Sequence, residues 1–115
     1  MPAAHESDEI PSVPYFLVLL VPSSNHQAGS EHFAAHVSFI ETMAAAHVVL
    51  LGGDFDSAVE GAEAAYLLRT GSRDAAQAWA AKDPFVAHAV YRPRIVAWKL
   101  VGIDPGAIDP ALAVV

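Results

Sequence analysis

An unbroken apolar run, from Tyr15 to Val21, is enclosed by Pro14 and Pro22. Seven residues that include aromatic and β-branched side chains are too few for a free-standing helix, so the run predicts a buried strand. A strand that is apolar on both of its faces belongs inside a sheet, with material packed against each side. The chain is therefore expected to build a layered domain around this strand.

Helix and strand patterns alternate along the rest of the chain. Phe33, Val37 and Ile40 recur at three- and four-residue intervals and predict a helix whose apolar stripe faces a sheet. The predicted elements in order are the strand Tyr15–Val21; a helix capped by Ser30; a strand Val48–Leu51 ended by Gly52-Gly53; a strand Ala62–Thr70; a helix capped by Ser72 and running through Ala81; and a strand Val90–Val101, with Pro93 marking an edge. This βαββαβ order predicts a ferredoxin-like α+β fold, a four-stranded antiparallel sheet with both helices on one face.

The sheet face without helices needs a cover in such a fold. The composition is 54% hydrophobic and only 17% charged, so a large apolar surface is available for burial. A second copy of the chain is the simplest cover, and we expect a homodimer. Residues 14–101 form the expected domain, between a polar N-terminal arm at 1–13 and a C-terminal tail at 102–115.

Charge and the missing cysteines exclude several classes of function. The net charge of -7, with only six Lys and Arg, argues against nucleic acid as a partner. The absence of cysteine excludes disulfides and thiolate chemistry, and no motif for a cofactor occurs. The acidic N-terminus does not resemble a signal peptide, and no apolar run approaches the roughly 20 residues of a membrane helix, so a cytoplasmic protein without membrane contact is expected.

His36 and Asp83 are the candidates for chemistry. His36 lies about 40° from Ile40 around the predicted helix and therefore at the edge of its apolar stripe. A carboxylate bonded to one imidazole nitrogen fixes the tautomer and leaves the other nitrogen free to exchange a proton near neutral pH. From the residues alone, a purely structural interpretation is equally open, in which His36 bonds a backbone carbonyl and Asp83 caps the backbone before Pro84.

Other polar residues have weaker claims to a role. His32 is four residues before His36, which is a metal-ligand spacing with Asp83 as the third ligand, but the absence of a metal is the favoured interpretation. Arg92 and Arg94 could attract an anionic substrate, yet such residues more often pair with acidic groups or face solvent. The expected cofactor and metal content is therefore none.

Four segments in order resemble the YciI-like (YCII-related) family over roughly Tyr15 to Leu100. They are His36-Val37-Ser38-Phe39-Ile40, Leu50-Leu51-Gly52-Gly53, Ala75-Ala76-Gln77-Ala78-Trp79 and Asp83-Pro84-Phe85. The resemblance implies a dimeric α+β barrel in which a histidine and an aspartate form the active-site pair, matched here by His36 and Asp83. It also implies kinship with a dehydrochlorinase of chlorinated hydroxyquinols and with the fold of muconolactone isomerase.

The sequence departs from the family pattern at two positions. His47 stands where a glycine usually closes the first helix, and Asp54 stands where proline often follows the glycine pair. Both departures concern the rim of the expected pocket, where Gly52, Gly53 and His88 are predicted to bind substrate. Three hypotheses follow: a small-molecule lyase or isomerase that uses His36 and Asp83 for proton transfer, a non-catalytic metabolite-binding module, and a structural dimerisation domain. A purely structural role predicts that these two side chains stay apart, with no cavity beside them.

Overall fold

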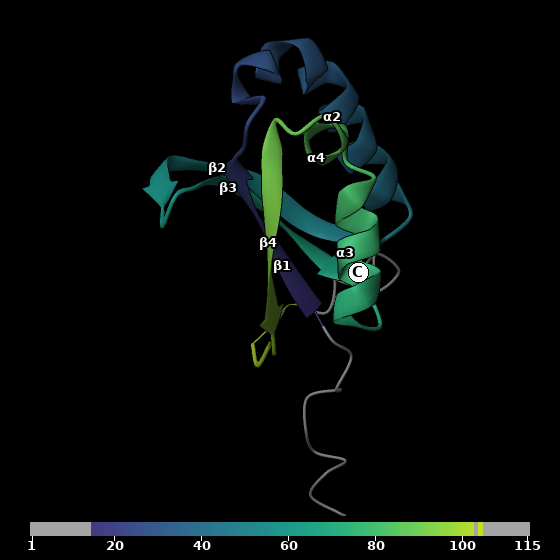
Figure 1. Ribbon diagram of the computed structural model, residues 1–115. Coiled ribbons are helices and arrows are strands. Elements are labelled where there is room, and N and C mark those ends of the chain that lie inside the picture. The colour runs from purple at the N-terminus through teal and green to yellow at the C-terminus, as the bar shows by residue number, and fades with distance from the viewer. Residues whose placement is uncertain (1–14, 103, 105–115) are drawn as a thin grey trace, which may run out of the picture.

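The protein is a layer of helices on an antiparallel sheet, seen in a computed structural model that describes residues 15–102 and residue 104 (Figure 1). The elements in order are β1 (Tyr15–Pro22), the 3-10 helix η1 (His26–Ala28), α2 (Gly29–Ala45), β2 (Val49–Val59), β3 (Ala62–Arg69), α3 (Arg73–Ala81), α4 (Pro84–Ala87) and β4 (Tyr91–Trp98). The predicted ferredoxin-like α+β fold is confirmed.

The apolar run that predicted a buried strand forms the inner strand β1. The sheet order is β2-β3-β1-β4, and β1 pairs antiparallel with both β3 and β4. Successive side chains of β1 point to opposite faces of the sheet. Phe16, Val18 and Leu20 are buried in the core against Ala76 and Ala80 of α3. Burial of each large apolar side chain stabilises the fold by about 1.5–3 kcal/mol, so this core is the main source of stability.

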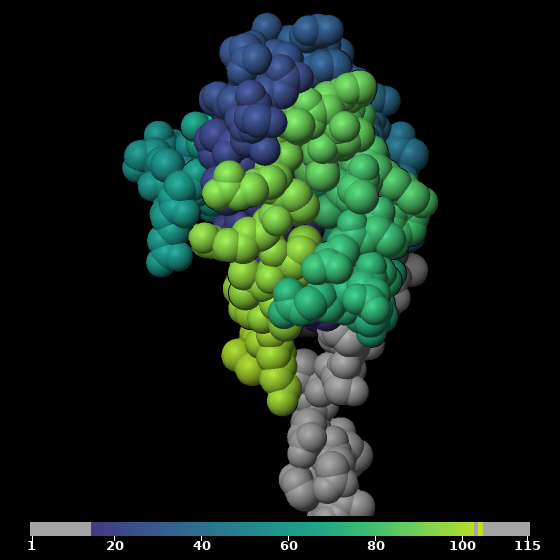
Figure 2. All heavy atoms as spheres, in the orientation of Figure 1, coloured from purple at the N-terminus to yellow at the C-terminus, as the bar shows by residue number. Residues whose placement is uncertain are grey.

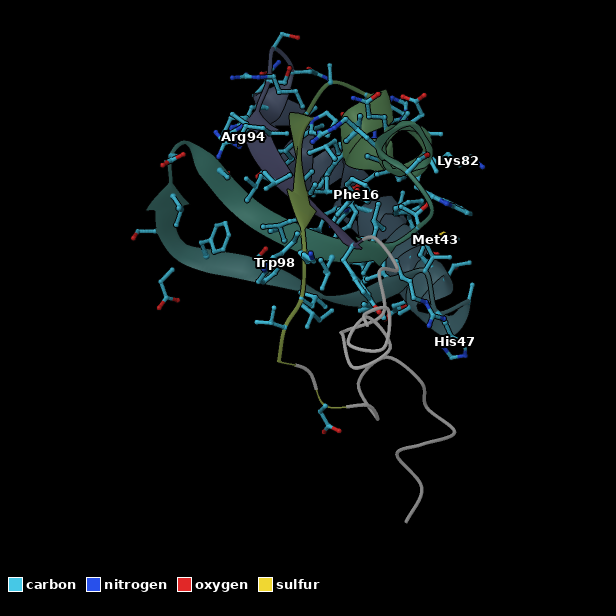
Figure 3. All side chains as sticks on the ribbon, turned by 90° about the horizontal axis from the view of Figure 1, so that it is seen from below. Phe16, Met43, His47, Lys82, Arg94 and Trp98 are labelled. Atoms are coloured by element: carbon cyan, nitrogen blue, oxygen red, sulfur yellow. The ribbon has the colours of Figure 1, made fainter. Side chains whose placement is uncertain are left out.

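The opposite face of the sheet has an apolar row that no helix covers in the described part of the chain. Leu17 of β1 is opposite Leu67 of β3 and Val96 of β4, and Leu67 is in turn opposite Leu51 of β2. Directly opposed residues share a face of a sheet. Trp98, next in β4 on this face, is 48% exposed, and Figure 3 shows it on the other side of the sheet from Met43 and Lys82 of the helical layer.

Strand β2 is longer than predicted. It does not end at Gly52-Gly53 but continues through them to Val59, because both glycines pair with β3, opposite Tyr66 and Ala65. The expected polar connection is instead a tight hairpin, in which Glu60 and Gly61 have φ values of 49° and 86°. Two consecutive positive φ values are those of a type I′ turn. The resulting β2–β3 hairpin projects from the body of the molecule (Figure 2).

The helix ends show which capping predictions were right. Ser72 caps α3 as predicted, since its Oγ accepts a hydrogen bond from Ala75 N at 3.1 Å. The predicted cap by Ser30 is wrong: η1 leads directly into α2, which has already begun at Gly29 with Ala28 at the N-cap. His47, after α2, has a φ of 64°, the left-handed conformation for which glycine is usual.

The last strand is an edge strand, as Pro93 predicted, because among the described strands β4 pairs only with β1. It ends at Trp98, short of the predicted Val101. The predicted arm at 1–13 lies outside the described residues, as does the predicted tail at 102–115 except for Gly102 and Asp104. Among the described helices, none is both long and apolar enough to cross a membrane.

Candidate functional site

His36 and Asp83 meet beneath helix α2. His36 is in the second turn of α2, and Asp83 is the N-cap residue of the short helix α4. The His36 Nδ1 lies 2.8 Å from the Asp83 Oδ1. Pro84 stands at the first position of α4, and Asp83 before it has an extended backbone with a ψ of 125°. The hydrogen bond expected from the sequence is therefore present, while its role in catalysis stays a prediction.

The Asp83 carboxylate is completely buried and accepts hydrogen bonds on both of its oxygens. Oδ1 accepts from His36 Nδ1 and from Phe85 N, the latter at 2.9 Å, and Oδ2 accepts from the Tyr66 hydroxyl at 3.2 Å. Burial, and then the charge of Asp83, raise the pKa of Tyr66 well above its usual range, so this hydroxyl keeps its proton and donates. Three donors thus hold one buried acceptor in a single orientation.

The same contacts orient the imidazole of His36. A carboxylate only accepts hydrogen bonds, so the hydrogen between the two groups resides on Nδ1. The neutral ring then has its lone pair on Nε2. The ring also stacks on Phe85, with a centroid separation of 4.2 Å and planes 15° apart. The His36 side chain remains 15% exposed, and its exposed part borders a cavity.

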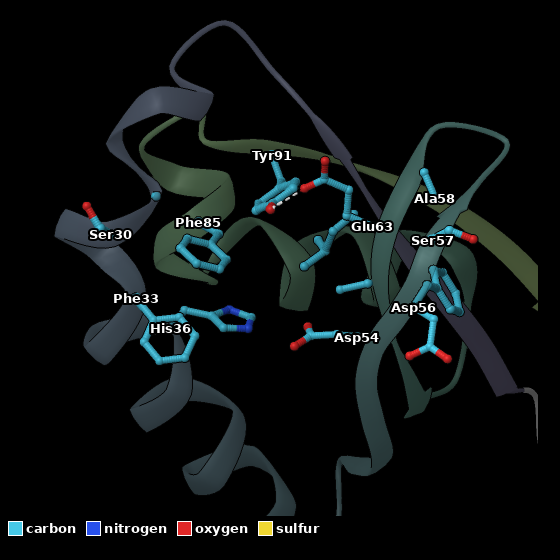
Figure 4. Close-up of a pocket in the computed structure, with 14 residues that line it drawn as sticks. Ser30, Phe33, His36, Asp54, Asp56, Ser57, Ala58, Glu63, Phe85 and Tyr91 are labelled. Atoms are coloured by element: carbon cyan, nitrogen blue, oxygen red, sulfur yellow. Dashed lines mark hydrogen bonds between the residues drawn. The ribbon is translucent and has the colours of Figure 1, made fainter.

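The cavity lies between α2 and the β2–β3 hairpin and has a volume of about 690 Å³ (Figure 4). Asp54 of β2 faces the ring of His36 across it. The lining residues are Leu20, Gly29, Ser30, Phe33, His36, Asp54, Phe55, Asp56, Ser57, Ala58, Glu63, Ala64, Phe85 and Tyr91. A volume of this size suits a small-molecule ligand.

The charge of the cavity wall is entirely negative. Asp54, Asp56 and Glu63 line it, and the described lining includes no Lys or Arg. Glu63 is held in place, since the Tyr91 hydroxyl donates to its Oε1 at 2.7 Å and His26 Nε2 lies 3.2 Å away. The hydrogen bond from Tyr91 lowers the pKa of Glu63, whereas burial and the Glu63 carboxylate together raise the pKa of Tyr91 to about 12.

The predicted substrate-binding residues divide into two groups. Gly52 and Gly53 line a second cavity of about 200 Å³, which shares His36 and Asp54 with the larger one. His88 lines neither cavity, and its exposed ring instead stacks on His32 at 4.0 Å. Substrate binding at these positions stays a prediction, and His88 has no contact in the structure that supports it.

The geometry also tests the alternative interpretations of the sequence. The three-ligand site considered for His32, His36 and Asp83 is not formed, because the described residues contain no such group of three in a metal-binding arrangement. A purely structural role predicted that the two side chains stay apart with no cavity beside them, and both expectations are wrong. The capping interpretation of Asp83 is correct but not exclusive, since Oδ1 serves Phe85 N and His36 together.

Sequence reasoning missed Tyr66, Glu63 and Tyr91. Strand alternation places Tyr66 on the same face as Leu68, beneath the helices, and a buried tyrosine hydroxyl requires a hydrogen-bond partner. That signal was available in the sequence, but it does not name Asp83 as the partner. Glu63 and Tyr91 are brought together by pairing between strands distant in the chain, which no local pattern reveals.

The two arginines considered as an anion site are engaged elsewhere. Arg94 Nη2 lies 3.4 Å from Glu60 Oε1, and Arg92 Nη1 donates to the carbonyl of Pro22 at 3.0 Å. Neither lines a described cavity. The interpretation that these residues pair with neighbouring groups is the one that the structure favours.

Comparison with known proteins agrees with this fold. The structure resembles that of 5-chloro-2-hydroxyhydroquinone dehydrochlorinase from Burkholderia phenoliruptrix AC1100 in complex with 2,5-dihydroxybenzoquinone, with a TM-score of 0.58 and 18% identity over 75% of this chain and 93% of the other. No curated protein matches in sequence. The model of the YCII-related domain matches residues 15–99, which include β1 to β4 and both members of the His36–Asp83 pair. The chain therefore belongs to the YCII-related family.

Proposed function

We propose that this protein is a small-molecule lyase or isomerase in which His36 transfers a proton and Asp83 orients it. The observation that carries the proposal is the 2.8 Å hydrogen bond between His36 Nδ1 and a completely buried Asp83 carboxylate, beside a cavity large enough for a metabolite. This arrangement directs the basic nitrogen, Nε2, toward the space in which a substrate would lie. Positioned general bases of this kind accelerate reactions by about 10²–10⁴-fold.

The proposed step is an elimination or a proton shift. Nε2 takes a proton from a carbon or hydroxyl of the substrate, and Asp83 stabilises the imidazolium that forms. In an elimination, the electron pair left behind forms the new double bond and a leaving group such as chloride departs. In an isomerisation, the imidazolium returns its proton to another carbon. Neither version requires a cofactor.

The lining favours a flat and uncharged or positively charged substrate. Phe33, Phe85 and Tyr91 offer aromatic surface, while Asp54 and Glu63 oppose the entry of an anion. The structural neighbour is a dehydrochlorinase bound to a dihydroxybenzoquinone, whose ring is also flat. Neutral chlorinated hydroxyquinols are therefore the first compounds to test, followed by aliphatic β-chloro alcohols and amines.

The test is turnover of such a panel, followed by mass spectrometry and chloride release. The wild-type protein is expected to convert at least one compound, and His36→Gln is expected to lower its rate by about 10²-fold or more. His32→Gln is the matched control, because His32 is one helical turn away and stacks on His88 outside the cavity. A His36→Gln variant as active as wild type would contradict the proposal. Compounds that bind and are recovered unaltered would favour the binding-module hypothesis.

We also propose that two copies associate through the helix-free face of the sheet. Leu51, Val96 and Trp98 are 60%, 40% and 48% exposed there, and exposed apolar surface of this kind is typical of an interface. A Trp98→Glu variant is expected to sediment as a monomer where the wild type sediments as a dimer. Phe33→Glu is the control, because Phe33 is equally exposed but lies on α2. A monomeric wild-type protein at micromolar concentration would contradict this proposal.

A further inference from the structure

The second oxygen of Asp83 has a partner that the proposed mechanism does not use. Tyr66, on β3, is only 2% exposed and donates its hydroxyl to Asp83 Oδ2 at 3.2 Å. It lies on the helical face of the sheet, opposite Val18 of β1. The other two donors, His36 and Phe85, both bind Oδ1. Tyr66 is therefore the one described donor on Oδ2.

A donor on Oδ2 matters because the carboxylate torsion of aspartate is soft. Rotation about the bond to the carboxyl carbon has broad minima, so contacts on one oxygen alone do not fix the plane of the group. A donor on each oxygen does fix it. The Asp83 plane sets the direction of the hydrogen bond to His36 Nδ1, and thereby which ring nitrogen carries the hydrogen.

Gly52 makes the position of Tyr66 sterically possible. It pairs with Tyr66 across β2 and β3, and a Cβ atom on Gly52 would lie 2.9 Å from the Tyr66 Cβ and 3.3 Å from the Ala65 carbonyl oxygen. Both contacts are close to the main chain, which cannot move aside as a flexible side-chain end can. At Gly53 an added Cβ would meet nothing within 4 Å. The steric demand is thus specific to the first glycine of the pair.

We propose that Tyr66 is a positioning residue for the His36–Asp83 pair and that Gly52, which lacks a Cβ, leaves the space that Tyr66 needs. Contacts run from Gly52 to Tyr66, from Tyr66 to Asp83 and from Asp83 to His36. Gly52 then serves the site through β3 rather than by touching substrate. This inference rests on the proposed function for its significance, but its geometry is measurable without any substrate.

The test is the tautomer of the neutral His36 ring, read from its ¹⁵N chemical shifts in the full-length protein, with His36→Gln used to assign the signals. Wild type is expected to carry the hydrogen on Nδ1. Tyr66→Phe removes the hydroxyl and keeps the ring, and is expected to lower the ratio of Nδ1–H to Nε2–H by roughly three- to tenfold, the effect of one hydrogen bond. Tyr91→Phe is the matched control, because its hydroxyl binds Glu63 instead.

Alanine substitutions at the two glycines test the steric role of Gly52 separately from the role of the Tyr66 hydroxyl. Gly52→Ala is expected to shift the ratio in the same direction as Tyr66→Phe, and Gly53→Ala to leave it at the wild-type value. An unchanged ratio in Tyr66→Phe would overturn the role of Tyr66. A shift in Tyr66→Phe without one in folded Gly52→Ala would overturn the role of Gly52. If Gly52→Ala does not fold, Gly53→Ala is still expected to fold, because its added Cβ meets nothing within 4 Å, and failure of both variants would overturn the steric role of Gly52. Because the readout is a tautomer, failure of the proposed reaction in turnover assays is a distinguishable result.

Discussion

Replacement of Asp83 by alanine is expected to destabilise the fold severely, because this side chain is both the partner of His36 and a structural acceptor. Alanine leaves two buried donors without a partner, the Tyr66 hydroxyl and the Phe85 N–H. Each unsatisfied buried group costs about 1–3 kcal/mol. His36 is part-exposed and can bond water instead. The two buried donors together cost about 2–6 kcal/mol, and relief from burying a carboxylate offsets part of this sum, which leaves an expected loss of about 2–4 kcal/mol.

Asparagine at the same position separates geometry from charge. The amide oxygen of Asp83→Asn can still accept from Phe85 N and His36 Nδ1, and its NH₂ can donate to the Tyr66 hydroxyl oxygen. The charge assistance of these bonds and the acceptor of the Tyr66 hydroxyl hydrogen are lost, which together amount to about 1–2 kcal/mol. Asp56→Ala, at an exposed position of β2, is the control and is expected to change stability by less than about 0.5 kcal/mol.

The assay is urea unfolding followed by circular dichroism, at one fixed protein concentration so that the contribution of association is the same for every variant. The expected order of stability is wild type, Asp56→Ala, Asp83→Asn and then Asp83→Ala. The reasoning would be refuted if Asp83→Ala lost less than about 1 kcal/mol, because the two buried donors would then not depend on Asp83. It would also be refuted if Asp83→Asn were as unstable as Asp83→Ala.

Three further predictions concern single side chains. His47→Gly is expected to raise stability by about 0.5–1 kcal/mol, measured by thermal unfolding, because glycine adopts the positive φ of this position without strain; His47→Ala retains a Cβ and is expected to show no such gain. Ser72→Ala is expected to cost about 1 kcal/mol in the same assay through loss of the α3 cap, and an unchanged midpoint would contradict this. Burial and Glu63 raise the pKa of Tyr91 to about 12, so the folded state keeps a proton that the unfolded chain releases from pH about 10. The free energy of unfolding is therefore expected to fall as pH rises from about 10 to about 12. The fall is expected to be smaller in Tyr91→Phe. In a spectrophotometric titration, Glu63→Gln should move one tyrosine transition to lower pH, and no movement would contradict the role of Glu63.

The fold was predictable because its signals are local. The apolar run of β1, the Ser72 cap and the order of helices and strands all follow from neighbouring residues, and each is seen in the structure. The error at the end of β2 arose because pairing with the next strand overrides local preference. Gly52 and Gly53 have the composition of a turn, yet β3 holds them in the ladder through Tyr66 and Ala65.

The candidate site was predictable in its two members but not in its surroundings. The position of His36 at the stripe edge and of Asp83 before a proline, together with the family pattern, was enough to expect the pair. The acceptor network of Asp83 joins α2 and the start of α4 to β3, and the contact between Tyr91 and Glu63 joins β4 to β3. Such contacts depend on strand register, and no local pattern determines the register of strands that are far apart in the chain.

The proposed mechanism requires that Nε2 of His36 is the unprotonated nitrogen at the cavity. The most direct measurement is the ¹⁵N NMR spectrum of the His36 imidazole in the wild-type protein, at a pH at which the ring is neutral. It is recorded with and without a compound that the protein converts. The proposed mechanism predicts a hydrogen on Nδ1, an Nε2 without a hydrogen, and a change in the Nε2 signal when the compound binds. A ring that carries its hydrogen on Nε2, or an Nε2 signal that bound substrate leaves unchanged, would contradict it.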